Sequence, residues 1–148
     1  MTTESKVNGV WNGILSSYFK YPYYIIAPEY WVPALDNVSG KGRTDLSVIS
    51  VAKGRTVLHL EGKRDDQNGA VEQLTKYLAA HDAKDKTMYG LAVSGNTVAF
   101  YRGAGTDYYP LGHDALGVGI ASSVQWYDLT KEDQLAPLHA ILRGMVSG

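Results

Sequence analysis

Two strand-like segments joined by a short glycine-containing turn limit the fold of this chain more than any other feature of its sequence. Residues 43–51 and 56–63 are rich in leucine and β-branched residues, and Ala52-Lys53-Gly54-Arg55 lies between them. Glycine adopts the positive φ that a short hairpin loop often needs. We therefore predict two antiparallel neighbouring strands, in which the start of the first lies beside the end of the second.

Further helices and strands are predicted on both sides of this hairpin. Apolar residues spaced by three and four indicate a helix over 6–19, and aromatic and β-branched residues between two prolines indicate a strand over 23–27. A helix with Asn68 as its candidate cap is expected over 70–81, and a second hairpin over 88–93 and 97–101. This order predicts an α/β fold with a central mixed sheet flanked by helices.

The last third of the chain has a weaker pattern until its final helix. The glycine-rich stretch 103–119 is expected to be a loop with a short strand at 108–111. Thr130 stands in the position of an N-cap before two acidic residues, which predicts a helix that runs to about residue 145. Pro137 would kink this helix or shift its start.

The composition is that of an ordinary globular protein. The chain has 148 residues, within the usual range of about 100 to 200 for one domain, so a single domain over 1–148 is expected. Cysteine is absent, which excludes disulfides, thiolate metal ligands and cysteine nucleophiles. The first residues lack the features of a signal peptide, and no apolar run reaches the roughly 18 residues of a membrane span. We therefore expect an intracellular protein of the cytoplasm or nucleus with no membrane partner.

Positive charge is concentrated in one segment. The whole chain carries 14 basic and 15 acidic residues, a net charge of −1. Residues 41–64 contain six basic residues and only two acidic ones, Asp45 and Glu61, which gives this segment a net charge of +4. Both carboxylates fall near the paired ends of the predicted hairpin.

A carboxylate from each hairpin strand is expected to reach one edge of the sheet. Asp45 lies near the start of the first strand, whereas Glu61 and Lys63 lie near the end of the second and share a face, because strand side chains alternate. Two crowded carboxylates repel each other unless a cation neutralises them. A hard divalent ion such as Mg²⁺ suits these oxygen ligands, and the backbone carbonyl of Gly62 is a further candidate ligand. The alternative is a cross-strand ion pair on a solvated face.

These residues resemble the motif of the PD-(D/E)XK nuclease superfamily. Asp45, fifteen further residues and then Glu61-Gly62-Lys63 match that motif on a β-hairpin, and Gln73 with Tyr77 resembles the QxxxY signature of RecB-like members. The stretch 89–101 is similar to the hairpin that follows the core helix in type I restriction nuclease domains and in small stand-alone members. The resemblance covers about residues 6–102 and leaves a C-terminal extension, 103–148 with the terminal helix, outside it.

The resemblance implies a restriction-endonuclease-like αβββαβ core and a Mg²⁺-dependent or Mn²⁺-dependent deoxyribonuclease. The metal ion would lower the pKa of a bound water, and Lys63 would position that water or help to deprotonate it. The implied roles are catalysis by Asp45, Glu61, Lys63, Gln73 and Tyr77, metal binding by Asp45, Glu61 and Gly62, and phosphate binding by Lys41, Arg43 and Arg64.

Other interpretations of the same residues stay open at this point. A catalytically inactive module of the same fold would bind nucleic acid, DNA or RNA, or a protein partner, and a homodimer is compatible with either form. A third hypothesis is a structural protein whose acidic C-terminal helix docks a partner or a second copy of the chain. Tyr77 on the apolar side of its helix is expected to pack in the core. The tyrosines near residues 18–24 would belong to core and rim or would stack on the bases of a single strand.

Overall fold

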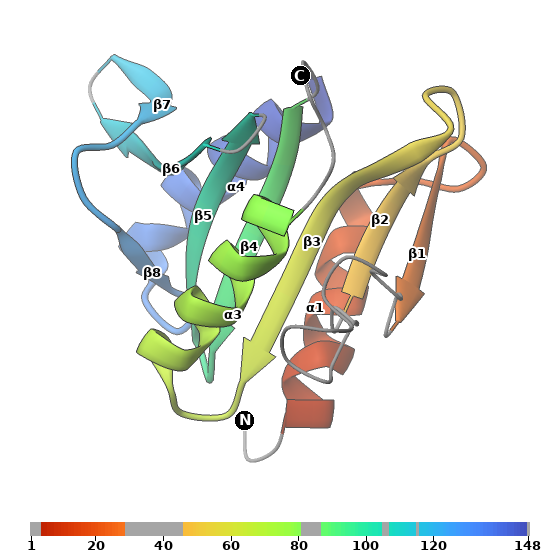
Figure 1. The fold of residues 1–148 in the computed structure, drawn as a ribbon. Helices are drawn as coiled ribbons and strands as arrows, with labels where there is room; N and C mark the ends of the chain where they lie inside the picture. The colour runs from red at the N-terminus through yellow and green to blue at the C-terminus, as the bar shows by residue number, and fades with distance from the viewer. Residues whose placement is uncertain (1–3, 29–45, 81–86, 105–106, 115, 148) are drawn as a thin grey trace.

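The computed structural model describes residues 4–28, 46–80, 87–104, 107–114 and 116–147, in which three helices and eight strands are present (Figure 1). In chain order these are α1 (Glu4–Tyr18), β1 (Tyr24–Pro28), β2 (Leu46–Ser50), β3 (Arg55–Lys63), α3 (Gln67–Ala80), β4 (Thr87–Ser94), β5 (Thr97–Ala104), β6 (Asp107–Asp114), β7 (Gly117–Ile120), β8 (Trp126–Asp128) and α4 (Glu132–Ser147).

The strands form one open sheet of order β1-β2-β3-β4-β5-β6-β7, and β8 pairs with the first part of β5. Only the β3–β4 pair is parallel among the described pairs, and α3 makes the crossover between these two strands. Every other described pair is antiparallel. The predicted α/β class and mixed sheet flanked by helices are therefore confirmed, with a sheet that is mostly antiparallel.

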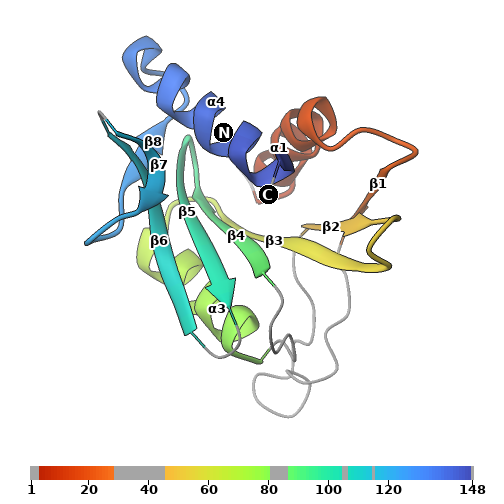
Figure 2. The same cartoon turned by 90° about the horizontal axis from the view of Figure 1, so that it is seen from above.

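Helices cover the two faces of the sheet unequally. Figure 2 shows α1 and α4 together on one face and α3 alone on the other. The larger core lies under α1 and α4, where Trp11 and Ile141 are fully buried against the β3 residues Leu58 and Leu60. The smaller core lies under α3, where Leu74 and other buried residues pack on small side chains of β4 and β5. Residues that alternate along one strand thus face two different cores.

The described helices are short, at 15, 14 and 16 residues. None of the helices in the described part of the chain is long and apolar enough to span a membrane.

Both predicted hairpins are confirmed in their described parts. The β2–β3 and β4–β5 turns contain Gly54 at φ 64° and Gly95 at φ 58°, a backbone region that glycine enters without a steric cost. The predicted helix over 6–19 and strand over 23–27 are also present, each shifted by one or two residues. The start of the predicted strand over 43–51 lies partly outside the described residues.

Both predicted helix caps are wrong. Helix α3 begins at Gln67 and its N-cap is Asp66, whose Oδ1 accepts a hydrogen bond of 2.8 Å from Gly69 N, so Asn68 lies inside the first turn. Helix α4 begins at Glu132, and the Thr130 hydroxyl donates instead to Asp128 Oδ1 at 2.6 Å. Pro137 lies within α4 without shifting its start, and it lacks the N–H that would bond one turn back.

The expected loop over 103–119 is also wrong. It contains the end of β5, all of β6 and most of β7. The predicted 108–111 strand lies within β6, which is longer, and three residues beyond this stretch form β8. These strands exist because they pair with β5 and with each other, for example Phe100 with Leu111 and Val98 with Tyr127. Local periodicity carries little trace of such long-range pairing.

Candidate functional site

The second half of β3 directs its polar side chains toward α3. Leu58 and Leu60 are fully buried in the core under α1 and α4. Because side chains alternate along a strand, His59, Glu61 and Lys63 lie on the opposite face, the one that α3 covers. The hydrophobic leucines thus fix which way the intervening polar residues point.

His59 links three elements at this site. Its Nδ1 lies 3.1 Å from Ser47 Oγ of β2, within hydrogen-bond distance in the sheet register that pairs Ser47 with His59. Its ring stacks on Tyr77 of α3, with ring centroids 6.1 Å apart and planes inclined by 29°. Tyr77 is only 5% exposed, so the expectation that it packs in the core is confirmed, whereas its expected catalytic role stays a prediction.

Gln73 lies one helical turn before Tyr77, on the same face of α3. Helix α3 runs antiparallel to β3 (Figure 1). Four residues of helix advance by about 6 Å, and two residues of strand by about 6.6 Å. Since Tyr77 is opposite His59, this spacing places Gln73 level with Glu61. The Gln73 Oε1 atom is buried and has no hydrogen-bond partner among the described residues.

Glu61 is a buried carboxylate with 5% of its surface exposed. The expectation that Glu61 lies on a solvated face is therefore wrong. Burial of an ionised carboxylate is costly unless hydrogen bonds, a cation or a metal ion compensate it. Lys63, two residues further along the same face, is half-buried at the end of β3. The strand thus presents an acid and a base in sequence on one face.

Three predicted site residues, Lys41, Arg43 and Asp45, lie outside the described residues. Glu61 and Lys63 lie on the face of β3 that is covered by α3, the helix that carries Gln73 and Tyr77, and Arg64 is exposed just after β3. Gly62 lies between Glu61 and Lys63 in β3 and pairs with Val93. In the described part of the chain, no three His, Asp or Glu side chains converge to hold a metal ion.

Ser47 is the residue of this site that sequence reasoning missed. Its side chain is fully buried, and its hydroxyl contacts His59. A serine between Leu46 and Val48, with the polar His59 at the same register of the next strand, is the signal that would have found it. Two polar residues facing each other across an otherwise apolar hairpin indicate a shared hydrogen bond.

An open hollow of about 540 Å³ lies where β3 and β4 end and α3 begins. Its lining includes Asp65, Asp66, Asn96 and Asp128. The backbone and hydroxyl of Thr130 donate to the Asp128 carboxylate and lower the pKa of that group below its usual value. The hollow follows Lys63 and Arg64 in the chain, at the carboxyl ends of two parallel strands, where ligands of α/β proteins often bind.

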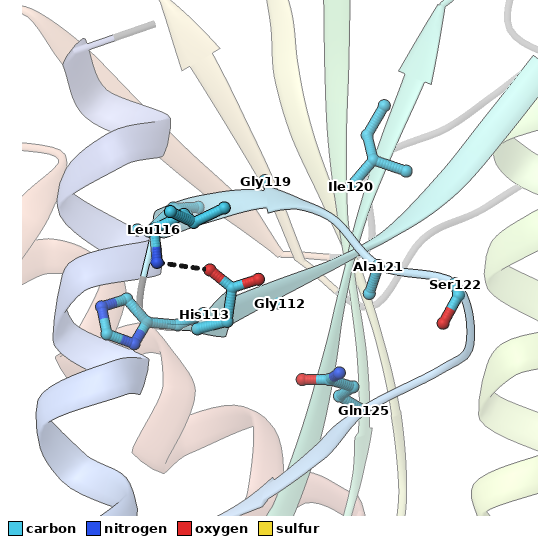
Figure 3. A pocket seen from close by; sticks show the side chains of 11 residues that line it. Gly112, His113, Leu116, Gly119, Ile120, Ala121, Ser122 and Gln125 are labelled. Atoms are coloured by element: carbon cyan, nitrogen blue, oxygen red, sulfur yellow. Dashed lines mark hydrogen bonds between the residues drawn. The ribbon is translucent and has the colours of Figure 1, made fainter.

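A second hollow, of about 340 Å³, lies between the β6–β7 hairpin and residues 121–125 (Figure 3). The Gln125 side chain reaches over Gly112, where an added Cβ would lie 2.7 Å from Gln125 Oε1. Asp114 is the one carboxylate among the described residues that line this hollow, and it already accepts a hydrogen bond of 2.8 Å from Leu116 N in the hairpin turn. The lack of a side chain at Gly112 leaves room for Gln125, and the hydrogen bond of Asp114 belongs to the turn, so these residues do not indicate a binding or catalytic role.

Comparison of the chain with protein-family models, with curated proteins and with solved structures finds no match.

Proposed function

We propose that this chain is a divalent-metal-dependent nuclease that hydrolyses phosphodiester bonds in DNA, with a restriction-endonuclease-like core. The observation that carries the proposal is the buried Glu61, which shares one face of β3 with Lys63 and lies level with Gln73 of the neighbouring helix. The order α1, β1, β2, β3, α3, β4 also agrees with the αβββαβ order implied by the motif.

The described residues supply one buried carboxylate and one buried amide oxygen, which suit a hard divalent cation. Glu61 supplies a buried carboxylate, and the buried Gln73 Oε1 lacks a hydrogen-bond partner among the described residues, so it is available to a metal-bound water. Oxygen donors of this kind are the ligands that Mg²⁺ and Mn²⁺ prefer. Asp45 is proposed as the second carboxylate, because it directly precedes Leu46, which pairs with Leu60 next to Glu61.

A bound Mg²⁺ would polarise the scissile phosphate and make a water molecule more acidic. The chain's own residues then have separate tasks. The Lys63 ammonium donates hydrogen bonds to the attacking water or to the phosphate and offsets the negative charge that develops there. Gln73 orients the water through its amide, and Tyr77 holds His59 and α3 against the sheet. Arg64, with Lys41 and Arg43, would bind phosphates along the substrate.

A cleavage assay that compares the wild type with Glu61→Gln tests this function. Plasmid, linear duplex and single-stranded DNA are incubated with each protein while Mg²⁺ or Mn²⁺ is titrated. We expect Glu61→Gln to lose at least 100-fold in rate, on the order of the effect of one strongly placed electrostatic group. Glu72→Gln is the matched control, because Glu72 is exposed on α3 in an ion pair with Lys76 at 3.4 Å.

Two results would contradict the catalytic proposal. One is equal cleavage by the wild type and Glu61→Gln, which would indicate a contaminating nuclease. The other is no cleavage by any variant on any substrate or metal. Binding of DNA without metal and without cleavage would instead support the non-catalytic module of the same fold.

A further inference from the structure

The turn between α1 and β1 exposes two tyrosines that the proposed catalytic site does not use. Tyr21 is 84% exposed and Tyr23 is 70% exposed. Backbone hydrogen bonds of 3.0 and 3.1 Å from Tyr23 N and Tyr24 N to Lys20 O close the turn that carries them. Phe19 is buried, and Tyr24 packs edge-on against it with ring centroids 5.1 Å apart. The core therefore accounts for Phe19 and Tyr24 and leaves Tyr21 and Tyr23 unexplained.

Apolar surface continues from this turn onto the sheet. Ile25 of β1 is 47% exposed and pairs with position 49 of β2, two residues from Ser47, so Ile25 and Ser47 share a face. Val51 is 54% exposed, and its N–H donates to Tyr23 O at 3.0 Å. Ser47 contacts His59, so this exposed surface lies on the same face of the sheet as the candidate catalytic residues.

Positive charge borders the same surface. Lys20 and Lys53 are exposed in the two turns that hold Tyr21 and Val51. The segments 19–28 and 46–60 contain no acidic residue. An anionic ligand would therefore meet cations at the edge of this surface and no like charge in either segment.

We propose that this surface binds single-stranded nucleic acid, with bases stacked on the tyrosines and phosphates paired with the lysines. We name it the tyrosine patch, which consists of Lys20, Tyr21, Tyr23, Ile25, Val51 and Lys53. Stacking on aromatic rings needs unpaired bases, because a duplex hides the faces of its bases. A cationic border with exposed aromatic rings is the usual chemistry of such sites.

The tyrosine patch would also lead a strand to the candidate catalytic site. From Arg55, at the start of β3, to Glu61 is six residues, or about 20 Å of extended strand on one sheet. A bound single strand running along this face would present a phosphate near Glu61. Only this last step rests on the proposed nuclease function; binding by the tyrosine patch does not.

Fluorescence anisotropy of a labelled oligothymidine of about 12 nucleotides, within the roughly 4 to 16 nucleotides of known single-strand sites, tests the proposal. Binding is measured with EDTA present, so that no cleavage occurs. We expect Tyr21→Ala/Tyr23→Ala to weaken binding by about tenfold or more, because stacking strongly favours aromatic side chains. Tyr21→Phe/Tyr23→Phe should keep the affinity of the wild type, since phenylalanine retains the ring.

Two further variants test whether binding is specific to the tyrosine patch and whether its lysines contact phosphates. Tyr109→Ala removes a tyrosine that is 39% exposed on β6, outside the patch, and should leave the affinity unchanged. Lys20→Ala/Lys53→Ala should flatten the dependence of log K on log salt by about 1.4, since each phosphate contact on a single strand contributes about 0.7. Circular dichroism checks that each variant is folded.

The outcomes are distinct. Wild-type affinity in Tyr21→Ala/Tyr23→Ala, equally tight binding of a duplex, or no binding at low salt would overturn the proposal. So would a change of oligomeric state in this variant without a change in affinity, which would identify the tyrosine patch as a protein contact. Binding in EDTA and cleavage in Mg²⁺ are both measured on the wild-type protein. Absence of cleavage with intact binding would therefore remove the proposed function alone, whereas cleavage without binding by the tyrosine patch would remove this inference alone.

Discussion

Replacement of Gly90 by alanine is expected to destabilise the contact between α3 and the sheet. Gly90 lies on β4 beneath α3, and an added Cβ would be 2.9 Å from Leu74 Cδ1, 3.1 Å from Leu74 Cδ2 and 3.1 Å from Leu78 Cδ1. Optimal carbon contacts are about 3.5 to 4.0 Å. Leu74 and Leu78 are buried, so their tips have little room to move, and α3 must shift by a few tenths of an ångström.

The expected cost is about 1 to 2 kcal/mol of the free energy of unfolding, because an extra methyl group in a packed core typically costs roughly 1 to 3 kcal/mol. For a chain of this length each kcal/mol lowers the melting temperature by about 2 to 4 °C. The melting temperature of Gly90→Ala should therefore fall by roughly 2 to 8 °C. Urea unfolding and thermal unfolding, both followed by far-ultraviolet circular dichroism, measure the change.

Two further variants decide whether the contact is the cause. Gly13→Ala adds a methyl group to α1 where no atom lies within 4 Å, and it should stabilise the protein by about 0.5 to 1 kcal/mol. Leu74→Ala alone should cost about 2 to 5 kcal/mol, but in Leu74→Ala/Gly90→Ala the new methyl group enters the vacated space. The double variant should thus lose at least 0.5 kcal/mol less than the sum of the single variants. Additive losses, or an unchanged stability of Gly90→Ala, would refute the reasoning.

Three other predictions follow from individual contacts. Asp66→Ala should cost about 1 kcal/mol by urea unfolding, because it removes the cap of α3, whereas Asp65→Ala should be nearly neutral. Leu142→Ala should cost about 2 to 5 kcal/mol, since this side chain of α4 is fully buried in the core against the sheet. The hydrogen bonds from Thr130 lower the pKa of Asp128 in the folded state, so they stabilise the fold above the usual pKa of an aspartate and this contribution is lost as the pH falls through the lowered pKa. Urea midpoints of the wild type and Asp128→Asn should therefore differ by a constant amount above about pH 5 and converge below about pH 4.

The hairpins could be predicted from the sequence because local signals agree there. Alternating apolar residues mark each strand, and the glycines at 54 and 95 supply the positive φ of each turn. The strands β7 and β8 and the full length of β6 could not be predicted in the same way, because they form by pairing with distant residues. The three residues of β8, for example, are ordered as a strand by their register with Thr97, Val98 and Ala99.

The cap of α3 shows a second limit of sequence reasoning. Residues 65–68 offer Asp65, Asp66 and Asn68, three side chains with similar capping chemistry. The choice is made by a tertiary contact, since Asp66 N donates a hydrogen bond of 2.7 Å to Ser94 Oγ at the end of β4. A pattern within the helix carries no information about that contact.

Part of the candidate site could be predicted from the repeat of side chains along a strand and along a helix. A spacing of two on the strand placed Glu61 and Lys63 on one face, and a spacing of four on the helix placed Gln73 and Tyr77 on another. The structure adds that these two faces oppose each other, with His59 stacked on Tyr77. Ser47 was missed because its signal depends on the register that sets it opposite His59, and this register is not visible within either strand alone.

The position of α4 has a consequence for biosynthesis. Its residues Leu138, Ile141, Leu142 and Met145 complete the core whose other side is built from the first helix and the early strands. The contact of Tyr18 with His139, at 2.5 Å between Oη and Nδ1, joins segments 121 residues apart. A ribosome makes the first helix and the sheet before it makes α4, so the emerging chain exposes an unfinished apolar face. The native core closes only after α4 has left the ribosome, and until then this face is the part of the nascent chain that a chaperone would bind.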